Sequence, residues 1–151
     1  MKKTLFLLFV LLVAGGGFAQ KAPQAKLISS SEDRIVVNFQ LNGFSTIKVQ
    51  TPQGEQCIVN VPEMAANLEA GAPELPTFPI PTIIGDFAEM TVDVIDASFT
   101  DYTMSIAPSK GNLSRQVNPE DVPYTYGEMY QQDAFWPAAQ ATLDAPYILR
   151  D

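Results

Sequence analysis

The single cysteine is the side chain with the most evident potential for chemistry in this sequence. Cys57 lies in the run Gln56-Cys57-Ile58-Val59, and the 151 residues contain no histidine. A cysteine nucleophile needs a nearby base to form the thiolate, so a Cys–His pair within this chain is excluded. Zinc sites of the usual Cys/His types and an intrachain disulfide are excluded as well. The apolar run therefore predicts a buried, inert thiol.

The carboxylates show no spacing that would support catalysis or metal binding. Asp93 and the pair Glu120-Asp121 are scattered, and no EF-hand loop is present. Seventeen Asp and Glu face nine Lys and Arg, which gives a formal net charge of −8. Nucleic-acid binding needs a basic surface, so this class of partner is not expected. We predict a chain without enzymatic activity, metal or other cofactor, whose acidic surface suits solubility or a basic partner.

One polar segment carries the basic side chains that could reach an acidic partner. Residues 108–123 are rich in Gly, Pro and Asn and are predicted to form a long loop. The loop contains Lys110, Ser114 and Arg115. Long loops in compact domains are often functional. Taken alone, however, a loop arginine is most simply a solvated surface charge.

The first nineteen residues have the three-part pattern of a secretion signal. Two lysines precede the apolar run Thr4–Ala14, and Gly17-Phe18-Ala19 offers a small-x-small cleavage pattern. The run is shorter than the roughly 20 apolar residues that span a bilayer. We therefore expect residues 1–19 to be a signal peptide cut between Ala19 and Gln20. The remaining chain would be exported through the inner membrane to the periplasm, cell surface or medium, without stable membrane insertion.

Alternating apolar residues and turn signals predict an all-β fold for residues 20–151. The predicted strands are residues 26–29, 34–41, 44–50, 56–61, 88–96 and 98–107, with another beginning at 147. Asn42-Gly43 is a hairpin signal, and Thr51-Pro52-Gln53-Gly54-Glu55 is a turn by composition. Residues 62–67 could form one helical turn. Without a convincing amphipathic helix, the pattern indicates one domain, an antiparallel β-sandwich or open barrel.

A proline-rich segment interrupts these strands. Prolines 73, 76, 79 and 81 lack the N–H that a central strand needs, so we expect an extended segment packed along an edge. Several apolar side chains are expected to fill the core. They are Leu75, Phe78, Ile80, Ile83, Ile84, Met90, Val92, Val94, Phe99, Tyr102, Met104 and Ile106, with the aromatic residues Tyr124, Tyr126, Tyr130, Phe135 and Trp136.

Three segments carry a motif pattern that no periodicity produces. They are Phe44-Ser45-Thr46-Ile47-Lys48-Val49-Gln50-Thr51-Pro52-Gln53-Gly54, then Gly71-x-Pro73-x-Leu75-Pro76, then residues 106–151. The third begins Ile106-Ala107-Pro108-Ser109-Lys110-Gly111 and ends Ala145-Pro146-Tyr147-Ile148-Leu149-Arg150-Asp151. Together and in this order they resemble the N-terminal propeptide of the gingipain-type cysteine peptidases of the Bacteroidetes. The second motif alone is weakly specific.

The resemblance implies a secreted β-sandwich prodomain that inhibits and chaperones a gingipain-type cysteine peptidase catalytic domain. It would occlude the active site until proteolysis removes it. Gingipains cut after Arg or Lys, and the resemblance places Arg115 in an inhibitory and processing loop, next to Ser114. Lys110 is a second candidate by its chemistry alone. A bidentate Arg–carboxylate contact would be charge-assisted and therefore strong.

Two further expectations complete this interpretation. Family propeptides continue beyond Ile148-Leu149-Arg150-Asp151, so we expect the domain to be incomplete at its C-terminal side. The alternative function is a secreted β-sandwich binding or adhesion module, for instance for carbohydrate. Exposed aromatic side chains would favour that module, and burial of Trp136 with Tyr124 and Tyr126 would count against it.

Overall fold

The computed structural model describes residues 22–85 and 88–147. The predicted signal peptide, with its cleavage point between Ala19 and Gln20, lies outside the described residues. Most of the strand expected to begin at residue 147 lies outside them too. None of the helices in the described part of the chain is long and apolar enough to cross a membrane.

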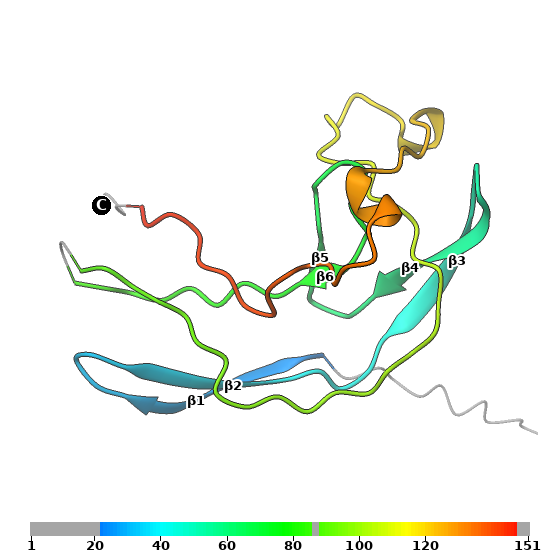
Figure 1. The fold of residues 1–151 in the computed structure, drawn as a ribbon. Helices are drawn as coiled ribbons and strands as arrows, with labels where there is room; N and C mark the ends of the chain where they lie inside the picture. Colours follow the sequence, from blue (N-terminus) through cyan, green and yellow to red (C-terminus); the bar gives the residue numbers. More distant parts are fainter. Residues whose placement is uncertain (1–21, 86–87, 148–151) are drawn as a thin grey trace, which may run out of the picture.

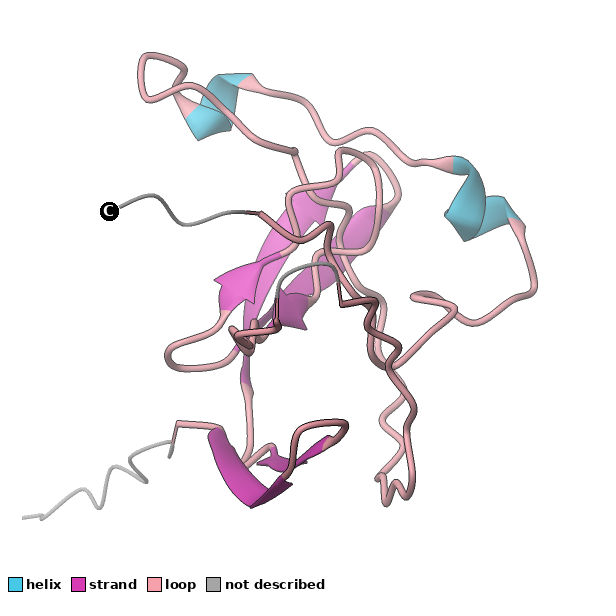
Figure 2. Cartoon of the chain, turned by 90° about the vertical axis from the view of Figure 1, so that its left-hand side faces the viewer, coloured by secondary structure: helices cyan, strands magenta, loops and turns pink. Residues whose placement is uncertain are grey.

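The described strands pair into antiparallel two-stranded sheets. The pairs are β1 (Gln24–Ser30) with β2 (Ile35–Gln40), β3 (Ser45–Thr51) with β4 (Gly54–Asn60), and β5 (Ala65–Ala66) with β6 (Pro76–Thr77). The strands predicted at 26–29, 34–41, 44–50 and 56–61 are confirmed as β1 to β4. The β1–β2 hairpin lies at one end of the molecule, away from the helical turns (Figure 1, Figure 2). The fold is all-β with antiparallel pairing, as predicted.

The hairpin predicted at Asn42-Gly43 is wrong, whereas the turn predicted at Thr51–Glu55 is confirmed. β2 and β3 do not pair with each other, because Asn42-Gly43 carries the chain from one hairpin into the next. The Asn42 side-chain amide donates to the carbonyl of Ala22 (2.8 Å), and this bond joins the end of β2 to the segment before β1. Gly43 has φ 131°, which is accessible to glycine. The β3–β4 hairpin closes at the predicted turn, where Thr51 pairs with Gly54.

The two strands predicted at 88–96 and 98–107 are wrong over most of their length. Figure 2 shows this stretch as loop, and residues 89–104 make no backbone hydrogen bond to another described residue. A strand needs a neighbour that supplies backbone donors and acceptors, and no described residue pairs its backbone with this segment. The predicted core positions Val92 and Val94 are accordingly 42% and 51% exposed. Only Ile106, near the end, forms a bridge to Cys57 in β4.

The buried centre of the described structure is small and lies around residues 107–109. Ala107 and Pro108 are fully buried, and Ser109 is 3% exposed. The other buried apolar side chains in the described ranges are Pro23, Val61 and Ala72. The motif Gly71-x-Pro73-x-Leu75-Pro76 packs against this centre, because Glu74 N donates to the carbonyl of Ala107 (2.9 Å). These contacts place the start of the 108–123 loop in the most buried part of the described structure.

Several of the predicted core side chains are exposed. Ile80 is 43% exposed, Ile83 92%, Met90 41%, Phe99 79%, Tyr102 63% and Phe135 95%, so the prediction is wrong for these six. Leu75, Phe78, Ile84, Met104, Ile106, Tyr124, Tyr126, Tyr130 and Trp136 are half-buried. The physical reason is the missing pairing of residues 89–104, which leaves that layer without an opposing surface. The Trp136–Pro137 peptide bond is cis.

Two short 3-10 helices follow the buried centre. η1 spans Pro119–Asp121 and η2 spans Glu128–Gln131. The helical turn predicted at residues 62–67 is wrong, because the chain makes a tight turn at Pro62-Glu63 and then enters β5. Glu63 has φ 65°, which does not continue a right-handed helix.

Candidate partner-binding loop

The loop that carries the predicted site residues begins at a fixed point, Ser109. The backbone N–H of Ser109 donates to Ala72 O (2.7 Å), and its carbonyl accepts from Gly71 N (2.9 Å). Its hydroxyl donates to Asn67 O (2.8 Å) and accepts from Gly111 N (3.1 Å). Four hydrogen bonds on one buried residue fix the direction in which the loop leaves the core.

Glycine is required two residues after Ser109. Gly111 has φ +81°, a conformation that side chains with a Cβ rarely adopt. A Cβ at this position would also lie 2.9 Å from Cβ of Ala70. The run Ser109-Lys110-Gly111 therefore has a structural cause. Ser109 anchors the loop, Lys110 carries the functional side chain, and Gly111 allows the chain to turn.

Lys110 is directed onto the chain itself. Its Nζ donates to the carbonyl of Pro119 (2.6 Å) and lies 4.4 Å from the centre of the Tyr124 ring. Burial raises the pKa of the nearby Glu74, and the positive charge of Lys110 opposes this increase. Burial also raises the pKa of Tyr124, with a further contribution from the charge of Glu74. Lys110, Glu74 and Tyr124 thus form one polar cluster under the loop.

Arg115 lies at the corner of a turn at the far side of the loop. The N–H of Val117 donates to the carbonyl of Ser114 (2.9 Å), which closes a four-residue turn with Arg115 and Gln116 at its centre. The Ser114 hydroxyl accepts from Gln116 N (3.4 Å), so Ser114 shapes the turn. Arg115 is exposed. Within the described ranges the one ion pair is Lys48–Glu55 (2.6 Å), so Arg115 has no carboxylate partner there.

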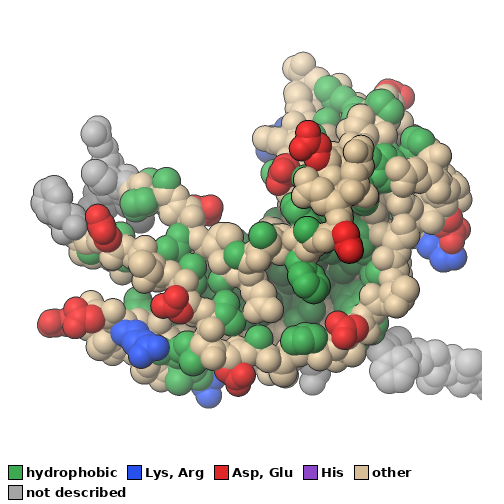
Figure 3. All heavy atoms as spheres, in the orientation of Figure 1, with side chains coloured by type: hydrophobic (Ala, Val, Ile, Leu, Met, Phe, Trp, Pro, Cys, Tyr) green, Lys and Arg blue, Asp and Glu red, His purple; other side chains and the backbone are tan. Residues whose placement is uncertain are grey.

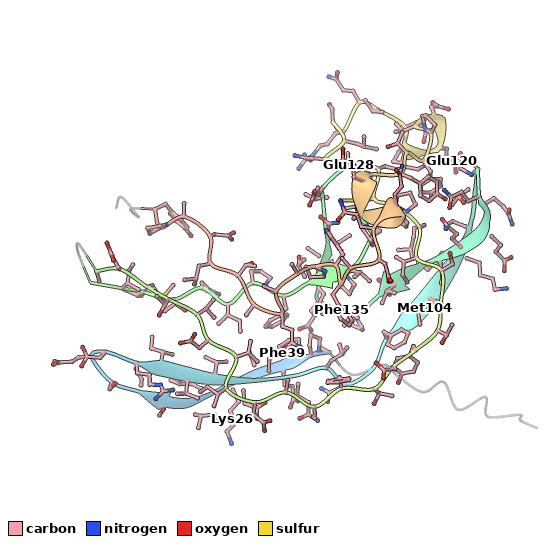
Figure 4. The ribbon with its side chains drawn as sticks, in the orientation of Figure 1. Lys26, Phe39, Met104, Glu120, Glu128 and Phe135 are labelled. Carbon is pink, nitrogen blue, oxygen red and sulfur yellow. The ribbon has the colours of Figure 1, made fainter. Side chains whose placement is uncertain are left out.

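The loop returns to the fold through η1. Asn118 caps this helix: its Oδ1 accepts from Glu120 N (3.2 Å), and its carbonyl accepts from Asp121 N (3.0 Å). Figure 4 shows Glu120 at the end of the molecule opposite Lys26 in β1. One base of the loop is therefore anchored to the core through Ser109, the other is a capped helical turn joined to it by the Lys110–Pro119 bond, and the turn with Arg115 lies between them.

A hydrogen-bond network that the sequence did not predict supports the loop from below. The Tyr126 hydroxyl lies 2.7 Å from Gln56 Oε1 and 2.8 Å from Thr51 Oγ1. Gln56 is 7% exposed and donates through Nε2 to Ser105 Oγ (3.0 Å). The one general rule that points to this network is that a tyrosine hydroxyl usually finds a hydrogen-bond partner when the ring is buried, and this rule does not identify the partner. The network ties the segment after the loop to the β3–β4 hairpin.

A second tyrosine reinforces this connection. Tyr130 packs edge to face on Tyr126, with ring centres 4.9 Å apart, and donates its hydroxyl proton to Ile106 O (3.0 Å). Burial raises the pKa of Tyr130 to about 12, with a smaller contribution from Tyr126. At neutral pH the hydroxyl is therefore a firm hydrogen-bond donor.

Cys57 lies apart from the loop. The prediction of a fully buried thiol is wrong, because Cys57 is half-buried at the side of β4 that faces residues 105–107. Its Sγ donates to Ser105 O (3.1 Å). No group of three or more Cys, Asp or Glu in the described ranges is arranged to hold a metal ion.

A family model described as Propeptide_C25 matches residues 18–151. The chain belongs to the C25 propeptide family. The resemblance noted from the sequence motifs is thereby confirmed. This propeptide is the non-catalytic region of a cysteine peptidase precursor, in agreement with the prediction that the chain is not itself an enzyme.

Two relatives and one solved structure show which members of the family this C25 propeptide resembles. Gingipain R1 of Porphyromonas gingivalis is 35% identical over 147 residues, covering 93% of this chain and 15% of the relative. Gingipain R2 of the same species is 36% identical over 149 residues, covering 95% and 20%. The chain thus spans at most about a fifth of these two relatives. A solved complex of Porphyromonas gingivalis RgpB pro- and mature domains matches with TM-score 0.79 at 35% identity, covering 87% of this chain and 70% of that chain.

Proposed function

We propose that this C25 propeptide inhibits and chaperones a gingipain-type cysteine peptidase catalytic domain by occluding its active site until proteolysis removes the propeptide. The observation that carries the proposal is the exposed Arg115 at the corner of a turn whose loop is anchored at both bases. A similar pro-domain has been solved together with its mature domain.

The chemistry of such a contact follows from the residue type. A peptidase that cuts after arginine recognises a guanidinium with a carboxylate, and Arg115 offers a guanidinium without a carboxylate partner among the described residues. A bidentate contact of this kind fixes orientation and is stronger than a neutral hydrogen bond. Because the loop is held before binding, less conformational entropy is lost on association.

The exposed apolar surface supports a function in a complex. Figure 3 shows apolar side chains along the hollowed face between the β1–β2 hairpin and the rest of the molecule. Leu27, Ile35, Ile80 and Ile83 line this hollow and are 58%, 43%, 43% and 92% exposed. Contiguous exposed apolar side chains are typical of interaction sites. Covering such surface would stabilise both partners, which is the physical basis of the chaperone role.

The proposal includes export. Residues 1–19 would be removed as a signal peptide between Ala19 and Gln20, and residues 20–151 would act as the propeptide domain in the periplasm or at the cell surface. A binding or adhesion module is not favoured, because the chain belongs to a propeptide family; the aromatic side chains do not decide, since Trp136 is half-buried and Phe99 and Phe135 are exposed.

The test is a titration of an Arg-specific gingipain-type catalytic domain with the purified chain and two variants. Arg115→Ala removes one charge-assisted contact, so inhibition should weaken roughly 10- to 100-fold. Arg34→Ala is the matched control, since Arg34 is also an exposed arginine and lies beside the β1–β2 turn. Equal inhibition by the two folded variants would remove Arg115 from the mechanism. No inhibition by the folded wild-type chain would refute the proposed function.

A further inference from the structure

We propose that Lys110 is a positioning residue that holds the two bases of the loop together and so sets how Arg115 is presented. Lys110 is then not a second cation for the peptidase. The inference deepens the proposed function and rests on it for the inhibition assay, but the conformation of the loop provides a readout that does not depend on any partner.

The ammonium of Lys110 spans the base of the loop. It leaves the chain directly after the buried anchor Ser109 and donates to the carbonyl of Pro119 (2.6 Å), which is the first residue of η1. Arg115 lies between these two points. One hydrogen bond therefore closes a ring of ten residues, and closing such a ring restricts the conformations of everything within it.

The surroundings of the ammonium favour this position over one in solvent. Its Nζ lies 4.4 Å from the centre of the Tyr124 ring, a distance at which a cation is attracted to the ring face. Burial raises the pKa of the half-buried Glu74 carboxyl, and the Lys110 charge lies close enough to oppose that rise. Lys110 itself is half-buried. A carbonyl, a ring face and a carboxylate thus all attract the same charge from within the chain.

Both bases that Lys110 connects are independently ordered. Ser109 makes three hydrogen bonds to the core side and one to Gly111, and Asn118 caps η1 on the other side. Apart from Lys110 and Gly111, the described loop residues between them make only the hydrogen bonds of the turn from Ser114 to Val117. Without Lys110, no hydrogen bond among the described residues would join the two bases of the loop.

The experiment compares Lys110→Met, Lys110→Arg and Arg115→Ala with the wild-type chain. Met keeps most of the side chain's volume but removes the charge and all donors, whereas Arg keeps both. Lys48→Met is the control, because Lys48 is an exposed lysine whose carboxylate partner Glu55 lies outside the loop. Each variant is measured by hydrogen–deuterium exchange of residues 112–118 and by its inhibition constant for the Arg-specific catalytic domain.

We expect Lys110→Met to speed exchange of the Val117 amide, which donates within the turn of the loop, at least tenfold, with unchanged exchange in β3 and β4, and to weaken inhibition roughly tenfold. Lys110→Arg should keep the exchange rate in the loop and the inhibition constant close to the wild-type values, and Lys48→Met should change neither quantity. Unchanged loop exchange in Lys110→Met would overturn the inference, and weakened inhibition with unchanged exchange would identify Lys110 as a direct contact instead. If the wild-type chain does not inhibit, the proposed function fails, while the exchange result still decides the role of Lys110.

Discussion

The Tyr126 hydroxyl is the part of the structure whose removal has the most predictable cost. Gln56 Oε1 can only accept, so Tyr126 must donate its single proton to Gln56 and can accept from Thr51. In Tyr126→Phe, the oxygen of Gln56, which is 7% exposed, loses its one partner among the described residues. Leaving a buried acceptor unsatisfied costs about 1–3 kcal/mol. Thr51 keeps its hydrogen bond to Gly54 O (2.9 Å), so losing the contact between Thr51 and the Tyr126 hydroxyl adds little to this cost.

We therefore expect Tyr126→Phe to lower the free energy of unfolding by about 2 kcal/mol. Equilibrium urea unfolding, followed by fluorescence of the single tryptophan, measures this value, and the m-value should not change. Tyr147→Phe is the matched control, because Tyr147 is 79% exposed and its hydroxyl makes no hydrogen bond to a described residue. If the two variants differ by less than about 0.5 kcal/mol, the network does not hold the hairpin as described.

Two further predictions concern pH. Burial raises the pKa of Glu74, so the folded protein binds this proton more tightly than the unfolded chain, and stability should rise as pH falls from neutral toward 4.5. Glu74→Gln should remove this rise in stability at low pH and should stabilise the protein at pH 7. Urea unfolding at pH 7 and pH 5 measures both effects. A variant less stable than wild type at pH 7 would contradict the argument. Burial raises the pKa of Tyr130 to about 12, so its contribution is complete below pH 10 and is lost as pH rises through 12. Tyr130→Phe should lose less stability than wild type between pH 10 and 12, as measured by thermal unfolding. If the stability of both proteins falls equally over this pH range, Tyr130 is not the group whose ionisation destabilises the fold.

The elements that the sequence predicts correctly are those that depend on neighbours along the chain. β3 and β4 alternate locally and are joined by a turn of suitable composition, so both strands and their turn could be predicted. Residues 88–96 alternate equally well, yet no strand forms there, because pairing depends on residues that are distant in the chain. Asn42-Gly43 is ambiguous for the same reason, since a flexible linker and a hairpin turn need the same residues.

The same distinction between local and long-range contacts decides which features of the candidate site the sequence could predict. The long loop and its exposed Arg115 could be predicted from composition and motif. The contacts of Lys110 with Pro119 and Tyr124 could not, because no sequence spacing indicates that a lysine will fold back across its own loop. The bond from Tyr126 to Gln56 joins residues 70 positions apart and depends on the tertiary fold.

That separation of 70 positions has a consequence for the order of folding. The β3–β4 hairpin contains only local contacts, and hairpins form within about 1–10 μs. Synthesis proceeds at about 5–20 residues per second, so Tyr126 is made roughly 4–14 s after Gln56. Throughout that interval the hairpin can form only without the hydroxyl that satisfies its buried amide. The nascent chain therefore passes through a stage in which its N-terminal half is formed but not yet locked, and the residues after the loop complete it.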